Sequence, residues 1–371
     1  MSQPATDIDA LLAEYRSLLQ PRGPDRDVAY RRRSHAQRYA EDAHVFFPGN
    51  AFLSGHHRGR TQVDALWQAA GVVWPQGTRL HKASYFVGED SIAIEWASRN
   101  RVWNGVEARN SGVGRLRFRG DRVVDHHEIT DTEFFDEVHG DWRSQMDPQL
   151  GAQLPSFRQA GPPWYPDPPQ APWAHDEATS DGTGRLPAAM REMAEELRAA
   201  LGAHDLPPMN CFAEDVDIFF QGRSGPLGGH HRGRAGVERL RRVIQQLWPD
   251  GHRLVRANLW ANESQVLVEW FVEYTLWNGR AAREGGFSVF DIRDSRTGRI
   301  QAVRSYLDTL LHAELLAGWR KQVGERLGSG LPTGRSLAAC DSRIPRAMSR
   351  AADSGPACCG RLSPWPEEEL P

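Results

Sequence analysis

The clearest pattern along the chain is an alternation of apolar and polar positions, which is typical of β-strands with one buried face. It occurs in four successive segments of the first half and in four more near the end. Asn104-Gly105 and Asn278-Gly279 lie between such segments and favour tight hairpins between antiparallel strands. The expected strands are 80–87, 92–102, 113–118 and 123–129, and then 254–260, 266–277, 286–292 and 300–307.

Helical patterns precede each set of strands. A first helix is expected to end at an Ala-Glu-Asp turn before a short apolar strand, and a loop with the sequence Gly-His-His-Arg-Gly-Arg is expected to lead into a second helix. Helices followed by an antiparallel meander are the pattern of an α+β domain. A curved sheet wrapped against such helices forms a cone, whose open end is a natural small-molecule pocket. The first helices are expected at 28–39 and 188–201, and the short strands at 44–47 and 217–220.

The two sets of elements belong to an internal repeat. The hexapeptide at 55–60 recurs unchanged at 229–234, an offset of 174 residues, and Trp-Asn-Gly recurs at the same offset. Because the offset stays nearly constant, the chain carries one domain twice and is no solenoid. We expect an N-terminal helical extension at 1–24, domains at 25–145 and 186–327, a Pro-rich linker at 146–185 and a disordered tail at 328–371.

Composition and charge exclude several classes of protein. A net charge of −3 over 371 residues gives no overall basic field, so we expect no nucleic-acid partner. No apolar run approaches the length of a membrane span, and the acidic N-terminal residues argue against a signal peptide. Four cysteines make no disulfide framework, so we expect a cytoplasmic protein. Metal-ligand spacing is lacking as well, and we expect neither a metal nor a cofactor.

The order of the motifs resembles a known family. The string Tyr-Ala-Glu-Asp-Ala, Gly-x-x-Gly-Arg at a helix entry, Trp-Asn-Gly in a hairpin and a last strand ending in Asp-Thr look like the SnoaL-like polyketide cyclases. They also resemble the ketosteroid isomerases of the same nuclear-transport-factor-two-like superfamily. The resemblance covers both copies, and it implies an α+β cone that dimerises sheet to sheet. Here the duplication supplies the second half, so we expect two tandem cone-shaped α+β barrels forming an intrachain pseudo-dimer.

The resemblance does not extend to the catalytic acids of the isomerases. The position of their catalytic Asp is Phe47 in the first copy and Phe220 in the second. Their oxyanion-donating acid aligns near Gly114 and Ser288, which are not acids. An isomerase mechanism of that type is therefore not expected, and the two phenylalanines are expected to line the pocket.

The end of the last strand carries the predicted catalytic groups. In SnoaL-like cyclases and limonene epoxide hydrolase-like proteins an acid there faces the pocket, and the resemblance places Asp131 and Asp308 at this position. Side chains alternate along a strand, so Asp131 shares a face with His127, and Asp308 shares one with Arg304 and Tyr306. A carboxylate in an apolar cone has a raised pKa, which suits a general acid or base. Alternatively, both aspartates only cap the helices that follow.

Other repeated residues have two readings each. His57 and His231, in the repeated hexapeptide, either contact a ligand at the pocket rim or only shape the entry to a helix. Glu95 and Glu269 lie in the middle of a strand, where we expect them to face the partner sheet. The remaining residues expected to contact substrate are Phe47, Phe220, Trp96 and Trp270.

These observations predict an enzyme of the isomerase or lyase type from secondary metabolism. It would use acid–base chemistry to cyclise, isomerise or dehydrate a hydrophobic metabolite that carries a carbonyl group, with the enolate held by Arg304, Tyr306 or His127. The second copy has the fuller set of polar residues. The first alternative is a non-catalytic module of the same fold that binds a small molecule or a protein. The second is an epoxide hydrolase, for which only Arg304 and Asp308 can be placed.

Overall fold

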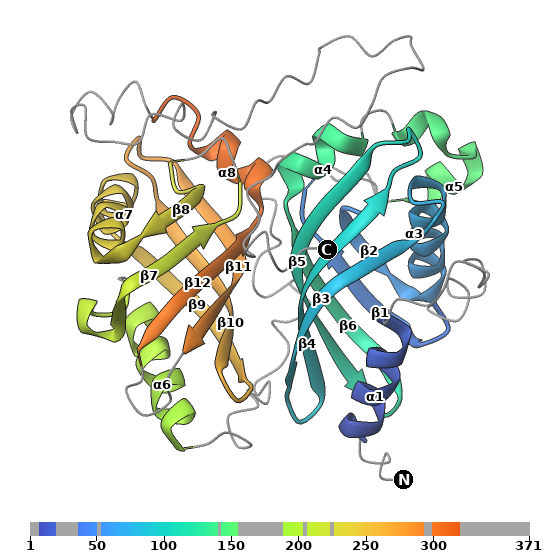
Figure 1. Ribbon diagram of the computed structural model, residues 1–371. Helices are drawn as coiled ribbons and strands as arrows, with labels where there is room; N and C mark the ends of the chain where they lie inside the picture. Colours follow the sequence, from blue (N-terminus) through green and yellow to red (C-terminus); the bar gives the residue numbers. More distant parts are fainter. Residues whose placement is uncertain are drawn as a thin grey trace.

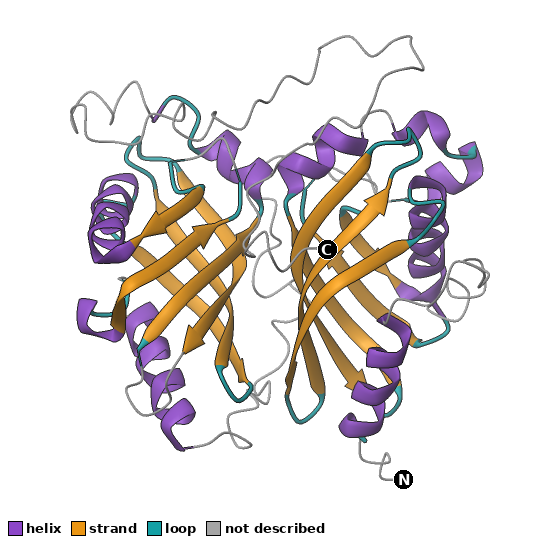
Figure 2. Cartoon of the chain, in the orientation of Figure 1, coloured by secondary structure: helices purple, strands orange, loops and turns teal. Residues whose placement is uncertain are grey.

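The computed structural model describes residues 7–19, 36–49, 53–139, 142–154, 188–202, 206–222, 226–292 and 299–319. These residues form two domains with the same order of elements (Figure 1). Each domain is a six-stranded sheet that curves around its own helices, as Figure 2 shows. The predicted tandem α+β fold is therefore confirmed.

The N-terminal domain has the sheet order β2-β1-β6-β5-β4-β3. β1 and β6 are parallel, whereas all other neighbouring strands are antiparallel. Its elements are α1 (Ile8–Leu19), β1 (Tyr39–Phe47), β2 (Gly55–Arg58), α3 (Gly59–Val73), β3 (Thr78–Val87), β4 (Ser91–Arg101), β5 (Glu107–Arg119), β6 (Arg122–Thr130), α4 (Thr132–His139), a 3-10 helix (Trp142–Gln145) and α5 (Pro148–Gln153).

The C-terminal domain repeats this topology with the order β8-β7-β12-β11-β10-β9. The strand pairs are again antiparallel except for β12 and β7, which are parallel. Its elements are α6 (Ala188–Gly202), a 3-10 helix (Met209–Cys211), β7 (Phe212–Phe220), β8 (Gly229–Arg232), α7 (Gly233–Leu247), β9 (His252–Ala261), β10 (Gln265–Thr275), β11 (Ala281–Ile292), β12 (Ile300–Leu307) and α8 (Thr309–Leu315).

Three local expectations need correction. The repeated Gly-His-His-Arg sequence is a short strand, β2 or β8, rather than a loop. The Ala-Glu-Asp sequences lie inside β1 and β7 rather than in turns. Helix α5 falls in the segment expected to be an extended linker, because Pro148 takes the first helical position, where its missing N–H costs nothing, and Asp147 caps the helix. The other linker residues, most of the helix expected at 28–39 and the tail at 328–371 lie outside the described residues.

The two faces of each sheet have different partners. In β4, Ile92 and Ile94 point into the core of the N-terminal domain, whereas Ala93 points to the other sheet. The two sheets pack face to face along the middle of the molecule, and the chain forms the predicted intrachain pseudo-dimer (Figure 1). The apolar residues between the sheets are Phe86, Ala93, Val113, Ile129, Trp260, Leu267, Phe287, Val289 and Tyr306.

Candidate functional site

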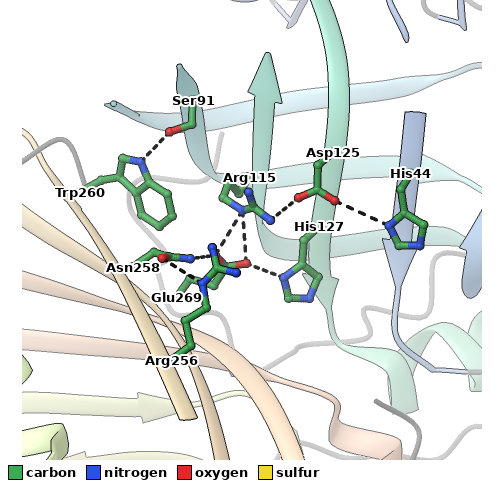
Figure 3. A network of polar contacts seen from close by, with 9 residues as sticks. All are labelled: His44, Ser91, Arg115, Asp125, His127, Arg256, Asn258, Trp260 and Glu269. Carbon is green, nitrogen blue, oxygen red and sulfur yellow. Dashed lines mark hydrogen bonds and ion pairs between the residues drawn. The ribbon is translucent and has the colours of Figure 1, made fainter. Parts of the chain in front are cut away.

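A network of buried charges crosses the interface between the sheets (Figure 3). The Nδ1 of His127, on β6, donates to Oε1 of Glu269 in the other domain at 2.7 Å. The Nε of Arg115 lies 3.2 Å from Oε2 of the same carboxylate, and the guanidinium also pairs with Asp125. Burial favours the neutral acid, but Arg115 and His127 outweigh it and lower the pKa of Glu269 to about 2. His127 therefore supports a charged contact between domains.

Arg304 and Tyr306, on β12, make the reciprocal contact. The Nε of Arg304 lies 2.6 Å from Oε1 of Glu95, and its Nη2 lies 3.0 Å from Oε2. The Tyr306 hydroxyl donates to Glu95 Oε1 at 2.8 Å, and Arg304 also pairs with Asp291 in its own domain. Each sheet thus receives a cation from the other at its central glutamate. The positions of Glu95 and Glu269 agree with the interface role expected from the sequence.

Asp131 and Asp308 lie at the start of α4 and α8. The Oδ1 of each accepts a hydrogen bond from the backbone N–H three residues later, at 3.0 and 3.1 Å. Each also accepts one from a threonine of the other domain: Thr309 donates to Asp131 at 2.8 Å, and Thr132 donates to Asp308 at 2.6 Å. The structure therefore uses both aspartates as helix caps that join the domains, as the alternative reading of the sequence allowed.

The predicted catalytic residues, two in the first copy and three in the second, do not face the cones of their own domains as expected. His127, Arg304 and Tyr306 face the partner sheet, and the two aspartates cap helices. Alternation along a strand identifies residues that share a face, but it does not say which face is concave. On β6 the residues that point into the cone are the alternate ones.

These alternate residues form a hydrogen-bonded chain on the concave face of the N-terminal domain. His126 Nδ1 lies 2.9 Å from the Tyr39 hydroxyl, and His126 Nε2 lies 3.0 Å from Oε2 of Glu128. Burial raises the pKa of Tyr39 well above its usual value, so the hydroxyl stays protonated and donates a hydrogen bond to Nδ1 of His126. The imidazole then carries its own proton on Nε2 and donates to Glu128. We call Tyr39, His126 and Glu128 the relay.

The exposure of the relay increases toward the carboxylate. Tyr39 is fully buried, the His126 side chain is 5% exposed and the Glu128 side chain is 19% exposed. A small molecule on the concave face would therefore reach Glu128 first. The other two residues orient that carboxylate from behind.

The predicted aromatic pocket residues lie on the concave faces of their own domains, Phe47 and Trp96 in the first and Phe220 and Trp270 in the second. The Phe47 ring contacts His126 edge to face, with ring centroids 5.3 Å apart. The Trp96 indole lies over Gly112 of the neighbouring strand, where an added Cβ would come within 2.7 Å of Cζ2. Trp270 lies over Gly286 in the same way, and Phe220 also packs against the core of its domain.

The two indoles differ in what their N–H groups contact. Trp270 Nε1 donates to the hydroxyl of Ser288 at 3.0 Å. The matching residue in the N-terminal domain is Gly114, and among the described residues no acceptor pairs with the N–H of Trp96. Both indoles cover their glycines with the same ring edge, so the Trp96 N–H points toward position 114. The carboxylate of Glu128 also lies over position 114.

The C-terminal domain lacks the relay. Positions 39, 126 and 128 correspond to Phe212, Val303 and Ser305. None of these three side chains is an ionisable acid or base. The relay therefore occurs in one copy only, whereas the interface glutamates, Glu95 and Glu269, occur in both copies.

Another polar cluster occupies the C-terminal cone. Glu284 Oε2 accepts hydrogen bonds from Tyr274 at 2.9 Å and from His312 at 2.8 Å. Burial alone would lower the pKa of His312, but the Glu284 carboxylate raises it above its usual value. A cavity of about 770 Å³ adjoins this cluster; its lining includes Tyr274, Leu311, Leu315, Arg253, Arg283 and Glu273. Both of these arginines pair with Glu273.

The repeated histidines have a structural contact. The Nε2 atoms of His57 and His231 donate to the backbone carbonyls of Leu53 and Leu227, at 2.8 and 2.7 Å. Burial lowers the pKa of His57 to about 4, so its ring is neutral at physiological pH. These contacts favour the reading in which the histidines fix the chain before the helix.

Within the described ranges, no three or more His, Cys, Asp or Glu side chains are grouped so that they could hold a metal ion. No helix within the same ranges is both long and apolar enough to cross a lipid bilayer.

Sequence reasoning did not select the relay. The sequence argument predicts that the face of β6 with His127 is the concave one, and it therefore does not select His126 and Glu128. A usable signal was present in the repeat: Glu128 is replaced by Ser305 in the second copy, which is unexpected if both positions only fill a core. Tyr39 lies in the motif that carried the family resemblance.

Comparisons with known proteins concern the fold of one domain at a time. No protein-family model and no curated protein matches the chain. An NTF2-like protein from Burkholderia xenovorans is 22% identical, covers 35% of this chain and 97% of its own, and gives a TM-score of 0.31. A proposed SnoaL-like polyketide cyclase from Mesorhizobium loti is 15% identical, with coverages of 32% and 97% and a TM-score of 0.26. Each of these proteins is similar in fold to about a third of the chain.

Proposed function

We propose that the chain is an acid–base enzyme for a small molecule with a carbonyl group, and that Glu128 of the N-terminal domain is its general base. The observation that carries the proposal is the relay, whose accessible end is a carboxylate oriented by His126. A base held by a second group that is itself oriented by a third is the usual arrangement for proton transfer. The C-terminal domain then acts as the sheet that covers the outer face of the first.

The proposed reaction begins with a proton on the carbon next to the carbonyl. An oxygen of Glu128 takes this proton, the electron pair of the C–H bond forms the C=C bond of the enolate, and the π pair of the carbonyl group moves to its oxygen. The free N–H of Trp96 donates to that oxygen and stabilises the enolate. Glu128 then returns the proton to the same carbon or to another one, and return to another carbon is an isomerisation. Attack of the enolate on a second carbonyl in the same molecule would be a cyclisation.

The contacts around the relay define the part of each residue. His126 keeps one oxygen of Glu128 occupied, which leaves the other for the substrate. Tyr39 holds the imidazole in the tautomer that donates to the carboxylate. Phe47 and the Trp96 ring offer apolar contacts to the substrate body. This division fits a hydrophobic carbonyl compound.

Deuterium exchange tests the proposal without knowledge of the natural substrate. The full chain is incubated in D₂O with aryl methyl ketones, such as 4-acetylbiphenyl, and deuterium at the methyl group is followed by NMR. We expect exchange above the buffer rate, and a loss of about 100-fold or more in Glu128→Gln. The matched control is Glu107→Gln, at an exposed position of the same domain, which should exchange like the wild type. Equal rates for Glu128→Gln and the wild type would refute the role of Glu128, and binding without any exchange would favour a non-catalytic binding module.

A further inference from the structure

Three buried polar atoms on the concave face of the N-terminal domain have no hydrogen-bond partner among the described residues. They are Ser98 Oγ, Asn100 Oδ1 and Asn110 Nδ2, in side chains that are 2%, 3% and 7% exposed. Ser98 and Asn110 are directly opposite each other on β4 and β5. All three share the face of Trp96, because they alternate with it in an unbroken register.

Such atoms are costly for a fold. A buried polar group without a partner costs about 1–3 kcal/mol, so three of them together are not explained by stability. The C-terminal domain fills the same positions differently, although Oε1 of Glu284 there also lacks a partner among the described residues. There they are Val272, Tyr274 and Glu284, and the last two form a hydrogen bond with each other. The N-terminal copy leaves the matching groups open.

The distance between this cluster and the relay follows from the spacing of residues along β5. Asn110 lies four residues before Gly114 on β5, and Glu128 lies over Gly114. At about 3.4 Å per residue, the two ends are about 14 Å apart. Trp96 lies between them, opposite Gly112. One elongated molecule with an apolar middle would span both ends.

We propose that Ser98, Asn100 and Asn110 form a distal subsite for a hydroxyl group of the substrate. This inference rests on the proposed function, since it places the reacting carbonyl end at Glu128. A hydroxyl group both accepts and donates, so it matches the amide N–H of Asn110 and the amide oxygen of Asn100. The substrate class is therefore a long, mostly apolar carbonyl compound with a hydroxyl at the far end, of the size of two or three linked rings.

Binding of a matched pair of ketones tests the subsite. The probes are 4-acetyl-4′-hydroxybiphenyl and 4-acetylbiphenyl, titrated into the full chain by calorimetry. We expect the wild type to bind the hydroxylated ketone about tenfold more tightly. The ratio should fall toward one in Ser98→Val, which introduces the residue of the second copy, and in Asn110→Ala. Ser98→Val should also melt no lower than the wild type, because an unpaired buried hydroxyl is removed.

The outcome is distinguishable from that of the proposed function. Glu128→Gln should lose deuterium exchange but keep the tenfold preference for the hydroxylated ketone. An affinity ratio near one in the wild type would overturn the subsite, and this is the result expected if only ordered water binds at these atoms. An affinity ratio that Ser98→Val and Asn110→Ala leave unchanged would also overturn it. If Asn110→Ala fails to fold, Ser98→Val decides the matter alone. Full exchange in Glu128→Gln would instead refute the base and leave the binding ratio as a valid test.

Discussion

The carboxylate of Glu128 lies directly over the α-carbon of Gly114 on the neighbouring strand. A Cβ built at Gly114 would be 3.1 Å from Oε2 and 3.3 Å from Cγ of Glu128. The missing side chain at position 114 therefore makes room for the proposed base.

The substitution Gly114→Ala should displace the carboxylate. The new methyl group needs a shift of a few tenths of an ångström, and Glu128 is a flexible side chain that can give way. We expect a tenfold or greater loss of deuterium exchange with a change in unfolding free energy below about 1 kcal/mol. Exchange rates and urea denaturation of the same samples measure both. An unchanged exchange rate would show that the position of the carboxylate does not matter.

Trp96 and Trp270 offer a matched pair for the proposed N–H donor. Phenylalanine keeps an aromatic ring but removes the N–H, and both variants lose the same outer ring edge over Gly112 or Gly286. Trp96→Phe should slow exchange by about 10–1000-fold because the enolate loses its donor. Trp270→Phe removes the hydrogen bond to Ser288 and the same ring edge in the C-terminal domain, and it should leave the exchange rate unchanged. Equal rates for the two variants would exclude a catalytic role for the indole N–H of Trp96.

The strands were predictable because their pattern is local. Alternation and the Asn-Gly turns located β4 and β10 to within two residues at each end, and the identical hexapeptides revealed the duplication. Helix α5 was missed because the high proline content of its surroundings favoured an extended linker, although a proline is well tolerated in the first turn.

The site was less predictable because the second sheet covers the outer face of the first. Ala93 and Ile94 point to opposite faces of β4, yet they are only 0% and 6% exposed. Alternation of polarity therefore weakens, and buried charges such as Glu95 mark the interface rather than the pocket. Only the packing of one sheet against the other decides which face is concave, and that is not a local property of the sequence.

The buried network at Glu269 should be sensitive to truncation. Glu269→Ala leaves the Arg115 guanidinium inside the interface without one of its two carboxylates. We expect a loss of about 3–5 kcal/mol in the free energy of unfolding, measured by urea denaturation near neutral pH. The control is Asp42→Ala, which removes an ion pair with Arg119 whose two side chains are 67% and 45% exposed. This variant should lose less than about 1 kcal/mol, and equal losses would show that the network adds little.

Asp308 should make stability depend on pH in the opposite direction from most carboxylates. Burial raises its pKa from 3.8 to about 6, and the hydrogen bonds from Thr132 and Leu311 only partly offset this. Between these two values the folded chain holds a proton that the unfolded chain has released. The free energy of unfolding contributed by Asp308 is therefore fully present below about pH 4 and falls as the pH rises through about 6.

Asp308→Asn tests this sign. The amide oxygen accepts the same two hydrogen bonds and carries no charge at any pH, so the variant should equal the wild type near pH 4 and be more stable near pH 7.5, by on the order of 1–3 kcal/mol. Urea denaturation at both pH values measures the difference. The matched control is Asp131→Asn, because Asp131 caps α4 in the same way but is partly exposed, and its effect should be smaller. If Asp308→Asn were less stable than the wild type near pH 7.5, the folded chain would need the negative charge of Asp308. Loss of deuterium exchange in this variant would instead indicate a catalytic role for Asp308.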